Sequence, residues 1–357
     1  MDNFDQKLVL VEYLYSKFGA DSFEDFREAL NEVEEGFKAD NRSRFKENLT
    51  SELEPTDWVW KRIDQYDQNI GEYEKKLNKN RDEDIRLKYF QYLSLLFTEI
   101  YLDLYYNDRE KLKKEFDQTI DDKKTELDAD DLYSLEEDNL SKLAYWMATG
   151  SGKTLIMHAN LWQFQKYSNQ DVENILLITP DSGLTEQHLE EFEESGIEAQ
   201  KFDPKNSSSS GTLVNVLDIY KLSDEKGEKT FPVEIFEGDN LVFIDEGHKG
   251  AQGDTWINYR EQVIGENGFS FEYSATFGQA LSSIDNEQLQ NRYVKSILVD
   301  YSFRNFHIDG FGKEYDILNL ADDDSTRRNK YLTANLLSFY EQKKYFSENS
   351  DKLADFN

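Results

Sequence analysis

The segment that most constrains this chain is ATGSGKT at residues 148–154, which we call the phosphate loop. It directly follows an apolar run, 142–147, and directly precedes a stretch with helical spacing, so we expect a strand–loop–helix unit. Glycines in such a loop turn backbone N–H groups toward a phosphate, the lysine reaches the β- and γ-phosphates, and the threonine binds Mg²⁺. The pattern predicts a nucleoside triphosphate site, although Met147 stands where the general pattern has Gly. The alternative is a strand-to-helix turn with an incidental lysine.

A second segment, NLVFIDEGH at residues 240–248, offers the acidic groups that such a site needs. Its apolar residues predict a buried strand, and its carboxylates follow at the carboxyl end, where open parallel sheets bind ligands. We expect Asp245 to hold the metal and Glu246 to polarise the attacking water. The alternative is a strand that ends in a solvated acidic turn, which is common in an acidic chain.

Short apolar runs alternate with helical stretches after residue 141, and this alternation predicts the fold. The runs that we expect to form strands are 142–147, 174–179, 212–217, 240–245, 269–275 and 296–301. Nearly continuous apolar strands between helices indicate an α/β fold with a parallel sheet covered on both faces. From residue 5 to about 107 the apolar residues recur at helical spacing instead, which predicts an α-helical N-terminal region.

The order of these segments resembles that of the superfamily 2 helicases and translocases. The phosphate loop is similar to motif I of that family, DEGH at 245–248 to motif II, and SAT at 274–276 to motif III. The DEGH form is most similar to the ATPase subunits of type I and type III restriction enzymes and their DEAD/DEAH-box relatives. The resemblance implies a RecA-like P-loop lobe that uses ATP and Mg²⁺ and acts on DNA, with a duplex expected.

The resemblance also implies roles for single residues. It implies that ATP is bound by Thr149, Gly150, Ser151, Gly152, Lys153, Thr154 and Gln91. It implies that Glu246, Asp245 and Lys153 are catalytic and that Thr154 and Asp245 are the metal ligands. The residues that couple hydrolysis to movement are His248, Ser274 and Thr276. A segment similar to motif Ia places Thr179, Pro180 and Gln187 at the nucleic acid.

Some of these residues have a plainer interpretation. Gln91 resembles the upstream glutamine that reads adenine in many relatives, but it lies unusually far before the phosphate loop, and the alternative is a glutamine in a core helix. SAT is a short string that chance supplies easily, and a lone histidine such as His248 is more often structural. The order and spacing of the motifs carry the assignment.

We expect three parts along the chain. Residues 1–140 form the helical region with a charged insertion, 141–300 the RecA-like ATP-binding lobe 1, and 301–357 a strand and helix extension with a linker towards a missing lobe 2. Motors of this kind close the ATP site with an arginine finger from a second lobe. Too few residues follow Thr276 to form that lobe, so catalysis is expected to be incomplete without it.

The composition limits the compartment and the chemistry. The chain has no cysteine, which excludes disulfides, thiolate metal sites and thiol catalysis. Its N-terminus lacks the pattern of a signal peptide, and its longest apolar stretch, 89–106, contains Glu99 and Asp103, so we expect a buried helix, no membrane partner and a cytoplasmic protein.

The net charge of −32 disfavours binding to nucleic acid in dilute salt. In molar salt the Debye length falls to ~3 Å, so a halophilic source would explain the acidity, although Lys outnumbers Arg.

The leading hypothesis is therefore an ATP-dependent DNA helicase or translocase of the restriction-enzyme type, acting with restriction-modification or defence-system subunits. The alternative is a truncated, non-catalytic nucleotide-binding module that regulates partner subunits. A P-loop kinase or GTPase is disfavoured because the sequence has no guanine-reading Asn-Lys-x-Asp pattern.

Overall fold

A computed structural model describes residues 4–38, 42–127, 132, 140–203, 212–223, 231–247, 254–282, 286–312 and 325–349. The side chains of 254–257 and 325–328 lie outside this description. Internal contacts divide the chain into two units, 1–312 and 313–357. In the second unit the described residues form helix α14 (Ser325–Glu348), whose described side chains are largely exposed.

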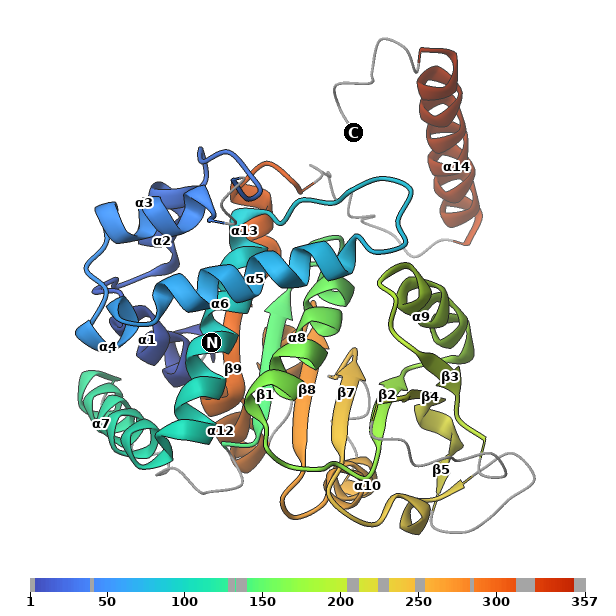
Figure 1. The fold of residues 1–357 in the computed structure, drawn as a ribbon. Helices are drawn as coiled ribbons and strands as arrows, with labels where there is room; N and C mark the ends of the chain where they lie inside the picture. The colour runs from blue at the N-terminus through green and yellow to red at the C-terminus, as the bar shows by residue number, and fades with distance from the viewer. Residues whose placement is uncertain are drawn as a thin grey trace. The chain divides into compact units, whose positions relative to one another are not determined.

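Helices make up the described part of the N-terminal region, as the helical spacing predicts (Figure 1). They are η1 (Phe4–Lys7), α1 (Val9–Ser16), α2 (Phe23–Leu30), α3 (Arg44–Glu52), α4 (Asp57–Trp60), α5 (Ile63–Leu77), α6 (Tyr89–Asn107) and α7 (Arg109–Leu127). The apolar stretch from Tyr89 forms α6, and nearly all of its side chains are buried. No helix in the described part of the chain has the length and apolar character to cross a bilayer.

A seven-stranded parallel sheet follows, with the strand order β3-β4-β2-β7-β8-β1-β9 (Figure 1). The strands are β1 (Lys142–Met147), β2 (Ile175–Thr179), β3 (Ala199–Lys201), β4 (Val214–Asp218), β7 (Leu241–Asp245), β8 (Phe269–Ser274) and β9 (Ile297–Tyr301). A separate short pair is formed by β5 (Leu222–Ser223) and β6 (Phe231–Pro232). Because every pairing is parallel, the loops after β1, β2, β7 and β8 emerge at the same edge.

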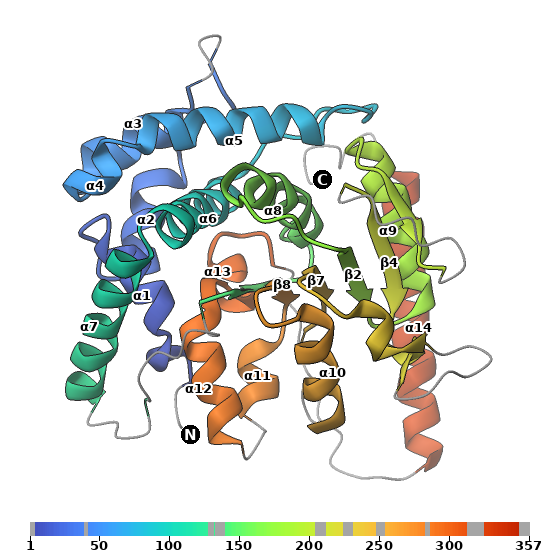
Figure 2. The same ribbon diagram turned by 60° about the horizontal axis from the view of Figure 1, so that its bottom comes forward.

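Helices cover both faces of this sheet. The helices between and after the strands are α8 (Lys153–Tyr167), α9 (Ser182–Glu194), α10 (Asp254–Ile264), α11 (Phe277–Ser282), α12 (Glu287–Ser296) and α13 (Phe303–Ile308), with short turns η3 (Ile219–Lys221) and η4 (Val233–Phe236). Figure 2 shows α6 and α8 on one face and α10, α11 and α12 on the other. This layering is the α/β, RecA-like arrangement expected from the sequence.

The N-terminal helices and the sheet share one hydrophobic core. Buried side chains of α1, α2, α5 and α6 belong to the same cluster as those of β1, β8 and β9. Phe90 of α6 and Tyr301 of β9 stack with ring centroids 3.9 Å apart. The helical region is therefore packed onto the sheet through a common interior, while the domain boundaries given above stay a prediction.

Each of the six apolar runs between residues 142 and 301 forms a strand, with ends shifted by two residues at most. The strand expected in the extension, at residues 315–320, lies outside the described residues. The short edge strand β3 was not expected, because its three residues, Ala-Gln-Lys, carry no apolar run. It extends the sheet only through its pairing with β4.

Candidate nucleotide site

The phosphate loop connects the end of β1 to the start of α8. Gly150 and Gly152 have φ angles of +84° and +88°, a left-handed conformation that favours glycine. Gly152 is the N-cap of α8, and no side chain caps the helix there. The first-turn N–H groups of α8 therefore have no intrahelical acceptor and face the loop, which suits a phosphate group.

Hydrogen bonds hold this loop from three sides. Inside the loop, the Ser151 hydroxyl donates to the Ala148 carbonyl oxygen at 2.7 Å. The Ala148 N–H donates to the carbonyl oxygen of Tyr301 on β9 at 2.9 Å. From α6, Gln91 Nε2 donates to the Ser151 carbonyl oxygen at 2.8 Å. The loop is thus fixed by the sheet and by the N-terminal helices together.

Gln91 lies directly against the loop. A Cβ on Gly152 would come within 2.3 Å of Gln91 Nε2, so the amide could not keep its present position beside a larger residue. Gln91 Oε1 accepts a hydrogen bond from the Lys88 N–H at 2.9 Å, so both polar atoms of the amide have protein partners. The residue is buried, with 7% of its surface exposed, and its expected contact with ATP stays a prediction.

Lys153 lies near both predicted acidic residues. Burial lowers the pKa of its ammonium group, while the charges of Glu246 and Asp245 act in the opposite direction. Its Nζ is 3.4 Å from the Met147 carbonyl oxygen. Thr154 follows in the first turn of α8 and is half-buried. A cation beside uncapped helix N–H groups, with two carboxylates near it, fits a triphosphate carrying Mg²⁺.

Glu246 follows β7 in a strained conformation. Its φ of +54° is the one positive value at a non-glycine position among the described residues, and such a backbone costs roughly 1–3 kcal/mol. The Glu246 N–H donates to Asp245 Oδ1 at 3.0 Å. The Gly247 N–H donates to the carbonyl oxygen of Tyr273 on β8 at 3.0 Å. These bonds hold the turn that presents the two carboxylates.

Asp245 also contacts α9, the helix that follows the segment similar to motif Ia. His188 Nε2 lies 3.1 Å from Asp245 Oδ2, and both side chains are largely buried. The sequence analysis did not single out His188. The sequence signal that could have found it is its position. His188 lies with Thr185 and Phe192 on the buried face of α9, where an imidazole is an unusual packing residue.

The three residues expected at the nucleic acid have different surroundings. The Thr179 side chain is fully buried, and its hydroxyl is 2.7 Å from the Thr185 hydroxyl. Pro180 is also buried, whereas Gln187 is exposed on α9 and donates to Glu191 Oε1 at 2.8 Å. Gln187 is the one of the three whose side chain is placed for an external contact.

The segment similar to motif III ends β8. Ser274 is buried, and its hydroxyl accepts a hydrogen bond from the Thr276 N–H at 3.0 Å. Thr276 is half-buried and directly precedes α11. His248 lies outside the described residues. The coupling roles of these three residues stay predictions.

The sequence analysis also did not identify a cluster of buried polar side chains that lies next to the turn of motif II. Arg260 of α10 forms an ion pair with Glu272 of β8, and the Tyr293 hydroxyl of α12 donates to Glu272 Oε2 at 2.8 Å. Glu272 Oε2 lies 3.0 Å from where a Cβ on Gly247 would be, so the group is placed against the motif II turn. No local sequence pattern joins three residues from three elements.

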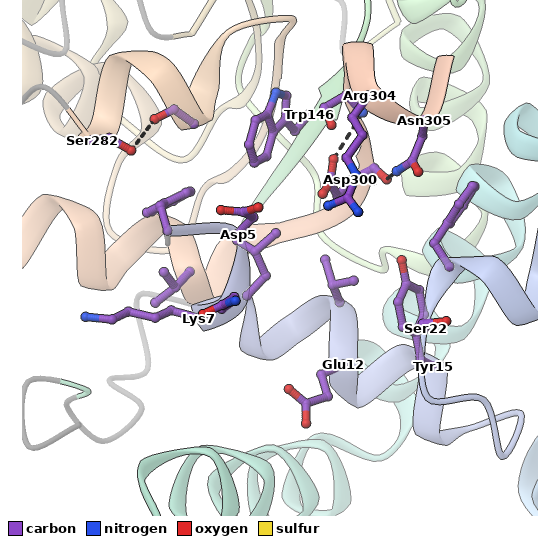
Figure 3. Close-up of a pocket in the computed structure, with 18 of the residues that line it drawn as sticks. Asp5, Lys7, Glu12, Tyr15, Ser22, Trp146, Ser282, Asp300, Arg304 and Asn305 are labelled. Carbon is purple, nitrogen blue, oxygen red and sulfur yellow. Dashed lines mark hydrogen bonds between the residues drawn. The ribbon is translucent and has the colours of Figure 1, made fainter. Parts of the chain in front are cut away.

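A large cavity lies elsewhere in the same unit. Its volume is about 1310 Å³, and none of the residues of the phosphate loop lines it. Figure 3 shows Trp146, Asp300 and Arg304 across this cavity from Glu12 and Tyr15. The candidate nucleotide site therefore rests on the geometry of the loop and its carboxylates rather than on the size of a cavity.

Known proteins resemble parts of this chain. Residues 109–279 match the family described as type III restriction enzyme, res subunit. Two solved structures show partial similarity. The SWI2/SNF2 ATPase core of Sulfolobus solfataricus in complex with dsDNA is 14% identical, with a TM-score of 0.32, over 45% of this chain and 31% of that one. The UvsW helicase of bacteriophage T4 is 17% identical, with a TM-score of 0.31, over 45% and 55%.

The chain thus matches about a third and about half of the lengths of these two proteins. None of the curated proteins is significantly similar to it in sequence.

Proposed function

Residues 109–279 form a domain of the type III restriction enzyme res-subunit family, within the superfamily 2 helicases, and from this we propose that the chain binds MgATP and hydrolyses it in response to DNA. The domain is a helicase-like ATPase domain. The restriction-type translocase activity, the duplex DNA substrate and the restriction-modification or defence partners belong to the proposal.

The observation that carries the proposal is the position of Lys153. It begins a helix whose N-terminus has no side-chain cap, and its ammonium group is in the electrostatic field of Asp245 and Glu246. A lysine that pairs only with carboxylates would not need an open helix N-terminus beside it. A triphosphate explains both features, because its charge complements the lysine and the helix N–H groups.

We assign the roles as follows. Lys153 and the phosphate-loop N–H groups bind the β- and γ-phosphates, and Thr154 and Asp245 hold Mg²⁺. When bound, Mg²⁺ would neutralise part of the negative charge of the phosphates. Glu246 orients and polarises the attacking water. Its positive φ is a strained backbone conformation of the kind that occurs at functional sites.

The link to DNA is assigned to the segments after β2 and β8. Gln187 contacts the nucleic-acid backbone, and Ser274, Thr276 and His248 couple the state of the nucleotide to that contact. Backbone contacts of this kind position a protein on DNA without reading its sequence. The net charge of −32 predicts that DNA binding needs enough salt to screen repulsion, or a local basic surface.

The test is a titration of the chain with a fluorescent ATP analogue and Mg²⁺, with and without duplex DNA, followed by phosphate-release measurements. We expect Lys153→Ala to weaken binding by about 10- to 100-fold, since a charged hydrogen bond is worth about 1.5–3 kcal/mol. Glu246→Gln should keep binding and lose hydrolysis. Lys166→Ala, an exposed lysine of the same helix, is the matched control.

Two results would count against the proposal. Binding that is unchanged in Lys153→Ala would refute the site. Binding of MgATP that never responds to DNA would favour the non-catalytic regulatory module.

A further inference from the structure

We propose that His188 is a positioning residue that fixes the carboxylate of Asp245 and ties it to helix α9. The inference rests on the proposed function, because it takes Asp245 as the residue that holds Mg²⁺. It adds a residue that has no role in the motifs described above. It also connects the segment similar to motif Ia, which is expected to contact the nucleic acid, to the proposed metal site.

The two oxygens of Asp245 have different partners. Oδ1 accepts from the Glu246 N–H at 3.0 Å, and Oδ2 lies 3.1 Å from His188 Nε2. Because an ionised carboxylate only accepts hydrogen bonds, His188 donates from Nε2. With one bond to each oxygen, the carboxylate cannot turn about its own axis without breaking one of them. Residues that hydrogen-bond to metal ligands in this way orient the ligand and raise metal affinity.

The surroundings of His188 argue against a purely packing role. The side chain is 4% exposed, and its Nδ1 makes no hydrogen bond to any described residue, since Glu191 Oε2 is 3.9 Å away. A buried nitrogen without a partner lowers stability relative to an apolar side chain of similar size. The ring is thus a poorer packing residue than leucine would be, and the contact that it gains is the one to Asp245.

Helix α9 connects this contact to the segment similar to motif Ia. Asp181 caps the helix by accepting from the Gly183 and Leu184 N–H groups at 2.9 and 3.0 Å. Gln187, the exposed residue expected at the nucleic acid, directly precedes His188 in this helix. Because a helix of 13 residues moves as one body, a shift at its first turns would move the imidazole against Asp245.

The same helix also packs against α8, which begins in the phosphate loop. Phe192 of α9 stacks on His158 of α8 with ring centroids 4.4 Å apart, and His158 Nδ1 is 2.8 Å from the Ser195 hydroxyl. Helix α9 therefore touches both elements that contribute to the nucleotide site, β7 through His188 and α8 through Phe192.

The experiment compares three variants in the full chain. His188→Leu removes the donor and fills the buried face, so it should fold as well as the wild type. His188→Asn keeps an N–H donor in a shorter side chain. Glu190→Ala changes an exposed residue of the same helix and serves as the control. Binding of a fluorescent ATP analogue is measured with Mg²⁺ and with EDTA, and thermal unfolding verifies the fold.

We expect His188→Leu to weaken binding of the Mg²⁺ complex about 10- to 100-fold, the loss typical of a lost partner of a metal ligand, and to leave binding in EDTA within about twofold. His188→Asn should recover part of the Mg²⁺ dependence. DNA should change MgATP affinity in the wild type and in Glu190→Ala, but not in His188→Leu.

Several results overturn the inference. An unchanged Mg²⁺ dependence in a folded His188→Leu protein refutes it, and so does equal weakening with and without Mg²⁺ that asparagine does not rescue. If the wild type itself binds no MgATP, the proposed function fails and the inference fails with it. A wild type that binds MgATP beside an unaffected His188→Leu refutes the positioning role alone.

Discussion

Gln91 Nε2 donates a hydrogen bond to the Ser151 carbonyl oxygen at 2.8 Å, so a helix of the N-terminal region directly holds the phosphate loop. Gln91→Ala should therefore weaken nucleotide binding by about 5- to 30-fold, because a buried carbonyl left without its donor costs about 1–2 kcal/mol. Gln165→Ala, an exposed glutamine on α8, is the control. Titration with fluorescent analogues of ATP and GTP measures the effect.

The two nucleotides separate two roles for Gln91. Both amide atoms already have protein partners, so we expect ATP and GTP to be weakened equally. A loss confined to ATP would show that the amide reads adenine and that its bond to Ser151 is secondary.

Gly152 should not tolerate a side chain. Its φ is +88°, and a Cβ there would lie 2.3 Å from Gln91 Nε2. Gly310 offers a matched comparison, because its φ is +80° and a Cβ there would meet no atom within 4 Å. Gly310→Ala therefore reports the backbone strain alone, which is about 1 kcal/mol or somewhat more.

Gly152→Ala should lower the free energy of unfolding by about 1–3 kcal/mol more than Gly310→Ala, as expected for overpacking, and should abolish nucleotide binding. Urea denaturation and the nucleotide titration measure the two effects. Equal destabilisation by both substitutions would show that the Gln91 amide moves away from the loop at little cost.

Local patterns in the sequence predicted the elements that carry the candidate nucleotide site. The apolar runs before the phosphate loop and before Asp245 are bounded by turn residues, and each forms the strand expected. Such runs depend only on neighbouring residues, so one sequence suffices to find them. The roles of the residues at the strand ends are still predictions.

Contacts between distant segments could not be predicted in the same way. The bond from Gln91 to Ser151 joins residues 60 positions apart, and the bond from His188 to Asp245 joins residues 57 apart. Neither has a periodic pattern, because each depends on how two helices pack on the sheet. Only a resemblance placed Gln91 near the nucleotide. The one local signal at His188, a histidine on the inward face of α9, does not show which residue its ring contacts.

The buried ion pair of Arg260 and Glu272 should be costly to break. Both side chains are at most 3% exposed, and Arg260 also donates to the Tyr293 hydroxyl at 2.9 Å. Removing one partner leaves an uncompensated buried charge, so Arg260→Met should lower the free energy of unfolding by about 3–5 kcal/mol. The double variant Arg260→Met/Glu272→Leu should be more stable than the single one.

Urea denaturation of the two variants measures this difference. A single variant that loses less than about 1 kcal/mol would mean that solvent reaches the pair and screens it. Because Glu272 lies against Gly247, the single variant should also weaken MgATP binding.

Glu99 is completely buried at the junction of three helices. It accepts hydrogen bonds from Asn69 and Tyr73 of α5 and from Gln163 and Tyr167 of α8. Burial raises the pKa of its carboxyl group above the usual 4.5, and the four hydrogen bonds only partly offset that effect. The folded protein therefore binds a proton at this group at pH values where the unfolded chain has released it.

Stability from Glu99 should accordingly be complete below about pH 4.5 and be lost as the pH rises through the raised pKa. Glu99→Gln removes this titration. The free energy of unfolding of the wild type minus that of Glu99→Gln should fall from pH 4.5 upward, by at most about 1.4 kcal/mol per pH unit, and then level off. Urea denaturation across this range measures it, with Glu190→Gln as an exposed control. A difference that stays constant with pH would show that Glu99 is ionised in the fold.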